Sequence, residues 1–130
     1  MRWVAAVCVA VAGCGGAAAE QPAMSADERA IRETLAQYVA AVRANDPAAV
    51  CRLTAGEVIE QIEAFGTSCE SVLGRQVRAG GPRYRLTTTS VSVRGNRAMT
   101  RGRAVESDGP RSGDQPLVRE GGRWLLTTNP

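Results

Sequence analysis

Four cysteines are the side chains of this 130-residue sequence best suited to chemistry, and histidine is absent. Without histidine the chain cannot form a Ser-His-Asp or Cys-His nucleophile system, and it lacks imidazole metal ligands. It also lacks the side chain that most often acts as a general base near neutral pH. The basic residues are all arginine, and the formal net charge of +3 does not require a nucleic-acid partner. We therefore expect no metal, no cofactor and no nucleic acid.

The first notable cysteine follows an apolar stretch over residues 3–12, in the tetrapeptide Val11-Ala12-Gly13-Cys14. The stretch is too short to span a bilayer but fits the apolar core of a signal peptide. The tetrapeptide resembles the lipobox of bacterial lipoproteins. This resemblance implies that Cys14 is acylated with palmitate-type chains and becomes the new N-terminus. Acyl chains would hold the protein at the extracytoplasmic face of the cell membrane.

The chain therefore divides into a signal peptide over residues 1–13, a lipidated cysteine with a flexible tether over residues 14–24, and one domain over residues 25–130. The alternative is an ordinary secretory signal that is cleaved near residues 17–19. Either route places the domain outside the cytoplasm.

Two cysteines remain for the domain, because Cys8 leaves with the signal peptide and Cys14 carries the lipid. Cys51 and Cys69 would lie in a compartment that permits disulfides, so we expect them to pair. A loop of this length contributes about 3 kcal/mol in the chain-entropy description. The alternative is two buried free thiols; two sulfurs without histidine are too few for structural zinc.

The first half of the domain has helical periodicity. A long amphipathic helix is expected to begin at a capping box of Ser25 and Glu28, with an apolar stripe of Ile31, Leu35, Tyr38 and Val42. Asp46-Pro47 should start a short helix over residues 48–53. Thr54 should cap a third helix and Thr67 a short fourth one. Val58, Ile62 and Phe65 mark the apolar face of the third helix, and Glu57, Glu60 and Glu63 are interpreted as its solvated face.

The second half alternates as strands do. Residues 84–94, with a bulge near Ser90, and residues 97–105 are expected to pair across a Gly95-Asn96 turn. Residues 107–115 are interpreted as a polar loop. Short strands over 116–119 and 123–128 should follow on either side of a glycine turn. The predicted architecture is α+β, with N-terminal helices packed on a curved four-stranded antiparallel sheet.

The order of these segments is similar to that of the NTF2-like superfamily. The resemblance rests on the opening helix IRETLAQYVAAV, the following NDPAA and the final VREGGRWLL. It implies a cone in which a bent sheet wraps the first helix. Enzymes of this superfamily, including ketosteroid-isomerase-like and polyketide-cyclase-like ones, place an acidic residue or histidine on the inner wall of the cone.

Strand alternation predicts which residues face this wall: Tyr84, Leu86, Ala98, Thr100, Ala104, Leu117, Trp124 and Leu126. None is acidic. Glu106 lies at a strand end and has the inward phase if the alternation continues, so the case for excluding it as a catalytic base is the weakest. We assign no catalytic residue.

Charge is distributed unevenly. Residues 75–103 contain no acid but many arginines, at positions 75, 78, 83, 85, 94, 97, 101 and 103. They either solubilise the outer sheet face or contact anionic lipid headgroups or a polyanionic wall polymer beside the membrane. Tyr38, Tyr84 and Trp124 are expected to point into the cone as a ligand pocket. We predict non-enzymatic binding of a small apolar ligand or an envelope protein. The alternative is an enzyme with a buried carboxylate, and a homodimer is compatible with either.

Overall fold

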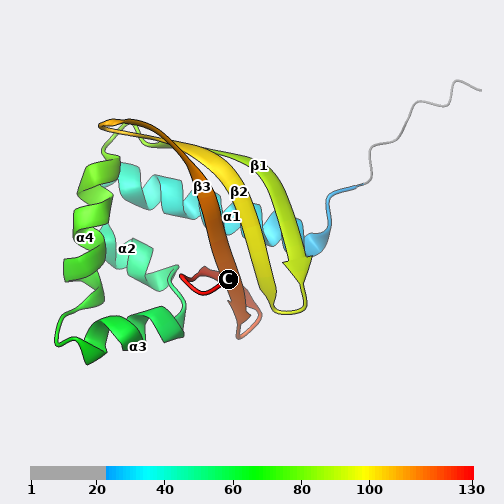
Figure 1. The fold of residues 1–130 in the computed structure, drawn as a ribbon, viewed down its shortest axis with the longest axis horizontal. Coiled ribbons are helices and arrows are strands. Elements are labelled where there is room, and N and C mark those ends of the chain that lie inside the picture. Colours follow the sequence, from blue (N-terminus) through cyan, green and yellow to red (C-terminus); the bar gives the residue numbers. More distant parts are fainter. Residues whose placement is uncertain (1–22) are drawn as a thin grey trace, which may run out of the picture.

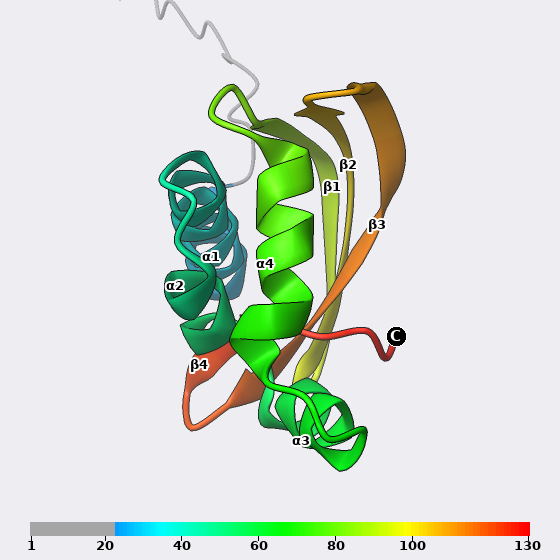
Figure 2. The same cartoon turned by 90° about the vertical axis from the view of Figure 1, so that its left-hand side faces the viewer.

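A computed structural model describes residues 23–130, so the predicted signal peptide and Cys14 lie outside the described part. Four helices precede a four-stranded antiparallel sheet with the strand order β1-β2-β3-β4. The sheet is curved, and helices lie against its concave face (Figures 1 and 2). This α+β arrangement is the one that the sequence predicts. Within residues 23–130 no helix is long and apolar enough to cross a membrane.

The first helix, α1 (Ala26–Arg43), begins where the sequence predicts, since Ser25 Oγ accepts a hydrogen bond from the Glu28 N–H at 3.1 Å. Its apolar stripe faces the sheet, and Ile31 and Leu35 are buried there. The Thr34 hydroxyl also donates to the Trp124 carbonyl oxygen at 2.8 Å. These contacts fix α1 along the concave face.

Three shorter helices complete the helical layer: α2 (Pro47–Arg52), α3 (Gly56–Ala64) and α4 (Cys69–Gly80). Asp46 caps α2 as predicted, whereas Ser68 rather than Thr67 caps α4. The Sγ atoms of Cys51 and Cys69 lie 2.15 Å apart, which is a disulfide distance. The expected pair thus joins α2 to the start of α4.

Two predictions about α3 are wrong. Thr54 does not cap the helix: its hydroxyl donates to the Val50 carbonyl at 2.8 Å, and Ala55 occupies the cap position without a side-chain hydrogen bond. Thr54 instead forms a parallel bridge with Leu126, so the end of the sheet determines its conformation. Phe65 lies beyond the end of α3, which stops at Ala64, so its side chain is not on the apolar face of the helix and is 87% exposed.

The strands are β1 (Arg85–Arg94), β2 (Arg97–Glu106), β3 (Gly109–Glu120) and β4 (Arg123–Leu126). The bulge expected near Ser90 is present as a register shift between Thr88 and Ser90. β4 is shorter than predicted and ends at Leu126.

The predicted polar loop over residues 107–115 is also wrong, because most of it forms the first half of β3. Pro110 to Gln115 pair in register with Val105 to Thr100 of β2. These β3 residues are largely exposed, so the segment has no apolar alternation to reveal it. Pairing with β2, which only the tertiary structure supplies, makes it a strand.

Candidate functional site

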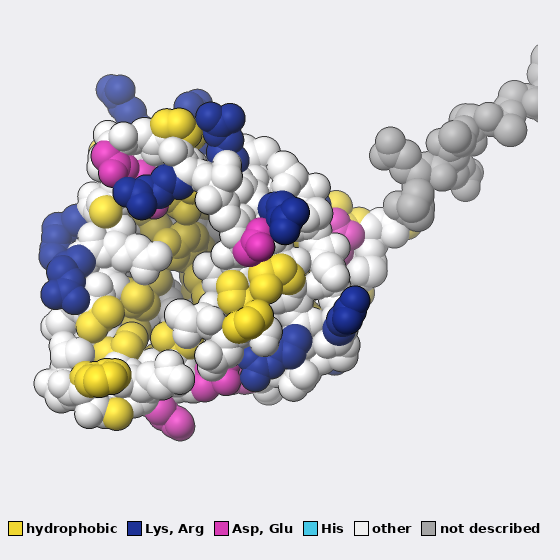
Figure 3. Space-filling model, in the orientation of Figure 1, with side chains coloured by type: hydrophobic (Ala, Val, Ile, Leu, Met, Phe, Trp, Pro, Cys, Tyr) yellow, Lys and Arg dark blue, Asp and Glu magenta, His cyan; other side chains and the backbone are white. Residues whose placement is uncertain are grey.

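A cavity of about 170 Å³ lies between α1, α4 and the concave face of the sheet. Figure 3 shows it as a hollow between α4 and β3 with hydrophobic side chains at its base. The apolar part of its lining comes from α1 and three strands, and consists of Leu35, Leu86, Ala104 and Leu126. Strand alternation predicted that the last three would face inward, and the cavity lining agrees.

Tyr38 and Tyr84, two of the three aromatic residues proposed from the sequence as a pocket, both line this cavity. Their rings meet edge to face, with centroids 5.8 Å apart and an interplanar angle of 86°. Tyr84 is only 6% exposed, and its carbonyl oxygen accepts a hydrogen bond from Arg43 Nε at 2.6 Å. On the other side, Gln76 Nε2 of α4 donates to the Tyr38 hydroxyl at 3.4 Å. The pair is thus held by three different elements.

Both phenols resist ionisation. Burial raises the pKa of the Tyr38 hydroxyl far above its ordinary value of 10.0, and the nearby Tyr84 and Glu106 add to the effect. Burial also raises the pKa of Tyr84, again with a contribution from the negative charge of Glu106. At neutral pH the cavity therefore presents two uncharged hydroxyl groups above an apolar base.

Glu106 faces this cavity, which corrects the expectation that the inner wall carries no acid. Its carboxylate is 23% exposed and pairs with Arg111 Nε at 2.9 Å. Arg111 also contacts Asp108 at 2.9 Å. Sequence alternation placed Glu106 in the inward phase. However, Arg111 was assigned to a loop, so its position opposite this carboxylate was missed.

Trp124 does not line the cavity, which corrects the predicted three-aromatic pocket. It is 3% exposed within a core cluster that includes Ile31, Leu35 and Leu117. Its Nε1 donates to Asp27 Oδ1 at 3.1 Å, near the start of α1. The indole needs a polar partner when buried, and Asp27 provides it away from the cavity.

A pair of glycines shapes the wall between the two tyrosines and β3. Gly102 and Gly113 are register partners on β2 and β3, and both line the cavity. A Cβ at Gly113 would meet no atom within 4 Å, whereas a Cβ at Gly102 would meet the Thr87 carbonyl oxygen at 2.6 Å. Gly102 therefore permits close packing beside the β1 bulge, and Gly113 leaves room in the cavity. Sequence reasoning missed this pair because Gly113 was placed in a loop.

A second cavity of about 90 Å³ continues from the first. The two share Tyr38, Gln76, Gln115 and Leu126. Half of its other lining residues are apolar side chains of α2, α3 and α4, namely Val50, Val58 and Leu73, and the other half are Thr54, Thr127 and Thr128. The Gln76–Tyr38 hydrogen bond thus lies where the two spaces meet.

The charged clusters found in the sequence take on more specific roles in the structure. Glu57 accepts hydrogen bonds from Arg97 at 3.1 Å and from the Thr127 hydroxyl at 2.5 Å, so it is not simply solvated. Arg101 pairs with Asp114 at 3.0 Å. Within residues 23–130, no three side chains among Cys, Asp and Glu are arranged to hold a metal ion.

No protein-family model matches the sequence, and no curated protein matches it. Solved structures do resemble it. An NTF2-like protein of unknown function from Shewanella baltica OS155 has a TM-score of 0.57 and 13% identity, over 77% of this chain and 87% of that one. A variant of Rv3472, a protein of unknown function from Mycobacterium tuberculosis, has a TM-score of 0.51 and 17% identity, over 77% and 67%. At such identities the likeness concerns the fold alone. The described part of this chain has the NTF2-like fold.

Proposed function

We propose that the domain binds a small ligand with an apolar body and one polar group, without transforming it. The observation that carries this proposal is the pair of neutral hydroxyls, Tyr38 and Tyr84, above an apolar base. Polar side chains such as Thr100, Gln115 and Glu106 line the rest of the hollow. Polar groups that converge beside an apolar base can orient a small ligand.

The size of the cavity limits the ligand. A dry protein cavity of roughly 150 Å³ accommodates benzene, and the main cavity here measures about 170 Å³. A single aromatic or alicyclic ring fits this space, and a short substituent could extend toward the second cavity past Tyr38. The tyrosine hydroxyls can donate a hydrogen bond, and the Glu106 carboxylate can accept one. Phenols and indoles combine a small ring system with an O–H or N–H group that can form a hydrogen bond with these side chains.

Gly113 offers a direct test, because a side chain there would enter free space. Titration of phenol and indole, followed by protein NMR, should show saturable shifts for the native protein. Gly113→Leu should abolish them by filling the cavity. Thr87→Leu adds similar bulk at an exposed position of β1 and should leave binding unchanged. Equal binding by both variants would show that the ligand does not bind in this cavity.

We also propose that this domain acts outside the cytoplasm, tethered to the membrane through Cys14. The support is the sequence Val11-Ala12-Gly13-Cys14 after an apolar stretch, together with a disulfide pair in the domain. Intact mass of protein purified from its native membrane tests this. A chain that begins at Cys14 and carries acyl groups would support the anchor. An unacylated chain beginning elsewhere would make the domain freely secreted.

The alternative is an isomerase or cyclase of the ketosteroid-isomerase-like or polyketide-cyclase-like type. It is favoured by one observation, the carboxylate of Glu106 beside two phenols in the cavity. The Arg111 partner argues against it, because an unpaired carboxylate in an apolar site is the stronger base. Isomerisation of a cyclic β,γ-unsaturated ketone, lost in Glu106→Gln while binding persists, would favour the enzyme.

A further inference from the structure

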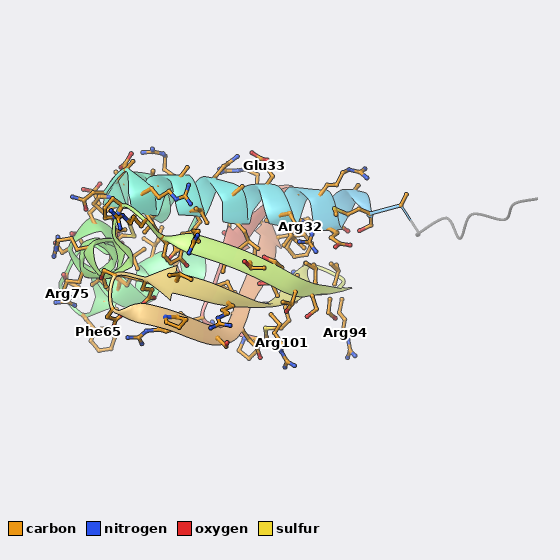
Figure 4. All side chains as sticks on the ribbon, turned by 90° about the horizontal axis from the view of Figure 1, so that it is seen from above. Arg32, Glu33, Phe65, Arg75, Arg94 and Arg101 are labelled. Atoms are coloured by element: carbon orange, nitrogen blue, oxygen red, sulfur yellow. A yellow bond between two sulfur atoms is a disulfide. The ribbon has the colours of Figure 1, made fainter. Side chains whose placement is uncertain are left out.

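One end of the domain is formed by three segments that are distant in sequence: the start of α1, the β1–β2 turn and the end of β3. The Arg119 N–H donates to the Asn96 carbonyl oxygen at 2.7 Å, and the Arg119 side chain pairs with Asp27 at 3.1 Å. The chain enters α1 at this end (Figure 1), and Figure 4 shows Arg94 there as well. We call it the tether end.

The tether end has an excess of positive charge. Each of its three acids has a partner: Glu28 pairs with Arg32 at 3.0 Å, Asp27 pairs with Arg119, and Glu120 accepts a hydrogen bond from the Gly56 N–H at 3.1 Å. Arg29 and Arg94 are exposed, and neither has an ion-pair partner among residues 23–130. Arg29 instead donates to the Met24 carbonyl oxygen at 2.5 Å, beside a Met24 side chain that is 41% exposed. Two free cations and an apolar side chain suit a membrane surface.

The proposed anchor would hold this end close to the bilayer. Ten positions separate Cys14 from Met24, and ten extended residues reach at most about 35 Å. The opposite end lies a helix length further away, and α1 with its 18 residues adds about 27 Å. Charges of lipid headgroups act over about 8 Å at physiological ionic strength. Arginines at the near end therefore lie closest to the anchor and come within this distance of the headgroups first.

We propose that Arg29 and Arg94 rest on anionic lipid headgroups when the protein is anchored through Cys14. The proposal depends on the lipid anchor but not on the ligand. Of the arginines between residues 75 and 103, Arg97 and Arg101 are engaged by Glu57 and Asp114.

This orientation determines where a ligand enters. Ser107, in the β2–β3 turn beside Glu106, donates to the Ala79 carbonyl oxygen at 2.6 Å near the end of α4. Arg43, at the end of α1, donates to Tyr84. The ion pair of Glu106 and Arg111, which lines the cavity, therefore lies at the far end of α1. Figure 1 shows the β2–β3 turn away from the point where the chain enters α1. The cavity would open to the aqueous phase, so its ligand would arrive from water rather than from the bilayer.

The test uses the acylated full-length protein in two vesicle preparations, phosphatidylcholine alone and phosphatidylcholine with about 30% phosphatidylglycerol. Arginines are modified with phenylglyoxal, and each position is followed by peptide mass spectrometry. Arg29 and Arg94 should react about fivefold more slowly on the anionic vesicles. Arg75 and Arg78, on α4, serve as internal controls and should react equally on both; Figure 4 shows Arg75 at the opposite end.

High salt should remove the protection, because it screens the headgroup charge. Charge reversal should also distinguish the tether end from the α4 end. Arg29→Glu with Arg94→Glu should make modification of the remaining tether-end arginine Arg32 the same on both vesicles, while Arg75→Glu with Arg78→Glu should preserve the difference.

Equal reaction rates on acylated protein, or protection of Arg75 and Arg78 instead, would overturn the proposed orientation and leave the anchor standing. Absence of acylation at Cys14, seen first by intact mass, would overturn both. Phenol binding measured on the same samples tests the cavity separately.

Discussion

The Trp124 indole donates its Nε1 hydrogen bond to Asp27 Oδ1 at 3.1 Å, and thereby joins the last strand to the first turn of α1. The same oxygen accepts from Arg119 at 3.1 Å. Arg119 also lies over the indole ring, 5.4 Å from its centroid. This contact draws the only tryptophan of the described residues into the core and leaves the cavity to the two tyrosines.

Removal of this acceptor should destabilise the domain. We expect Asp27→Ala to lower the free energy of unfolding by about 1–2 kcal/mol, because a buried indole N–H loses its partner. Asp27→Asn retains an acceptor and should cost less than half as much. Urea unfolding monitored by Trp124 fluorescence would measure both. Equal losses would mean that the ion pair with Arg119, rather than the indole contact, stabilises this end.

Glu57 should give the domain a component of acid sensitivity. The Thr127 hydroxyl and the Arg97 guanidinium bond its carboxylate and hold its pKa below the ordinary value of 4.5. A lowered pKa stabilises the folded state above the unfolded-state value, and this stabilisation disappears as pH falls through the folded-state value. Urea midpoints measured from pH 6 down to about 3 should therefore fall less for Glu57→Gln than for the native protein. Glu60→Gln, on the exposed side of α3, is the matched control and should follow the native curve.

Two glycines should respond oppositely to the same added methyl group. A Cβ at Gly80 would overlap Cγ1 of Val42, so Gly80→Ala should destabilise by about 1–3 kcal/mol. Gly113→Ala enters free space and reduces the freedom of the unfolded chain, so it should be neutral or stabilising by up to about 1 kcal/mol. Thermal unfolding should separate the variants by several degrees. Similar midpoints would show that α4 shifts to accommodate the methyl group.

The tyrosines should ionise at a higher pH than an exposed phenol. The chain has only two, Tyr38 and Tyr84, and burial raises the pKa of both. Since the unfolded state releases these protons first, stability should decline as pH rises above about 10. Ultraviolet absorbance of the phenolate should therefore appear together with unfolding. A normal titration of the folded protein would show that water reaches the hydroxyls. Glu106→Gln removes a negative neighbour and lowers the folded-state pKa of both hydroxyls, so stability should decline less steeply above this pH than in the native protein.

Local patterns in the sequence determined much of the fold. The periodic stripe of α1, the caps at Ser25 and Asp46, the Gly95-Asn96 turn and the bulge near Ser90 all depend on neighbouring residues, and each is present. The predicted partnership of Cys51 and Cys69 required only that two cysteines remain in the domain. Tyr38 and Tyr84 followed from helix and strand alternation.

Only the tertiary structure decided the features that depend on distant partners. The first half of β3 is too polar for alternation to reveal, and it is a strand because β2 supplies its hydrogen bonds. That pairing places Arg111 against Glu106 and Gly113 against Gly102, which completes the cavity. Thr54 and Trp124 likewise took partners at the far end of the chain, Leu126 and Asp27. A sequence shows which groups need a partner, but competition among distant partners is resolved only when the chain has folded.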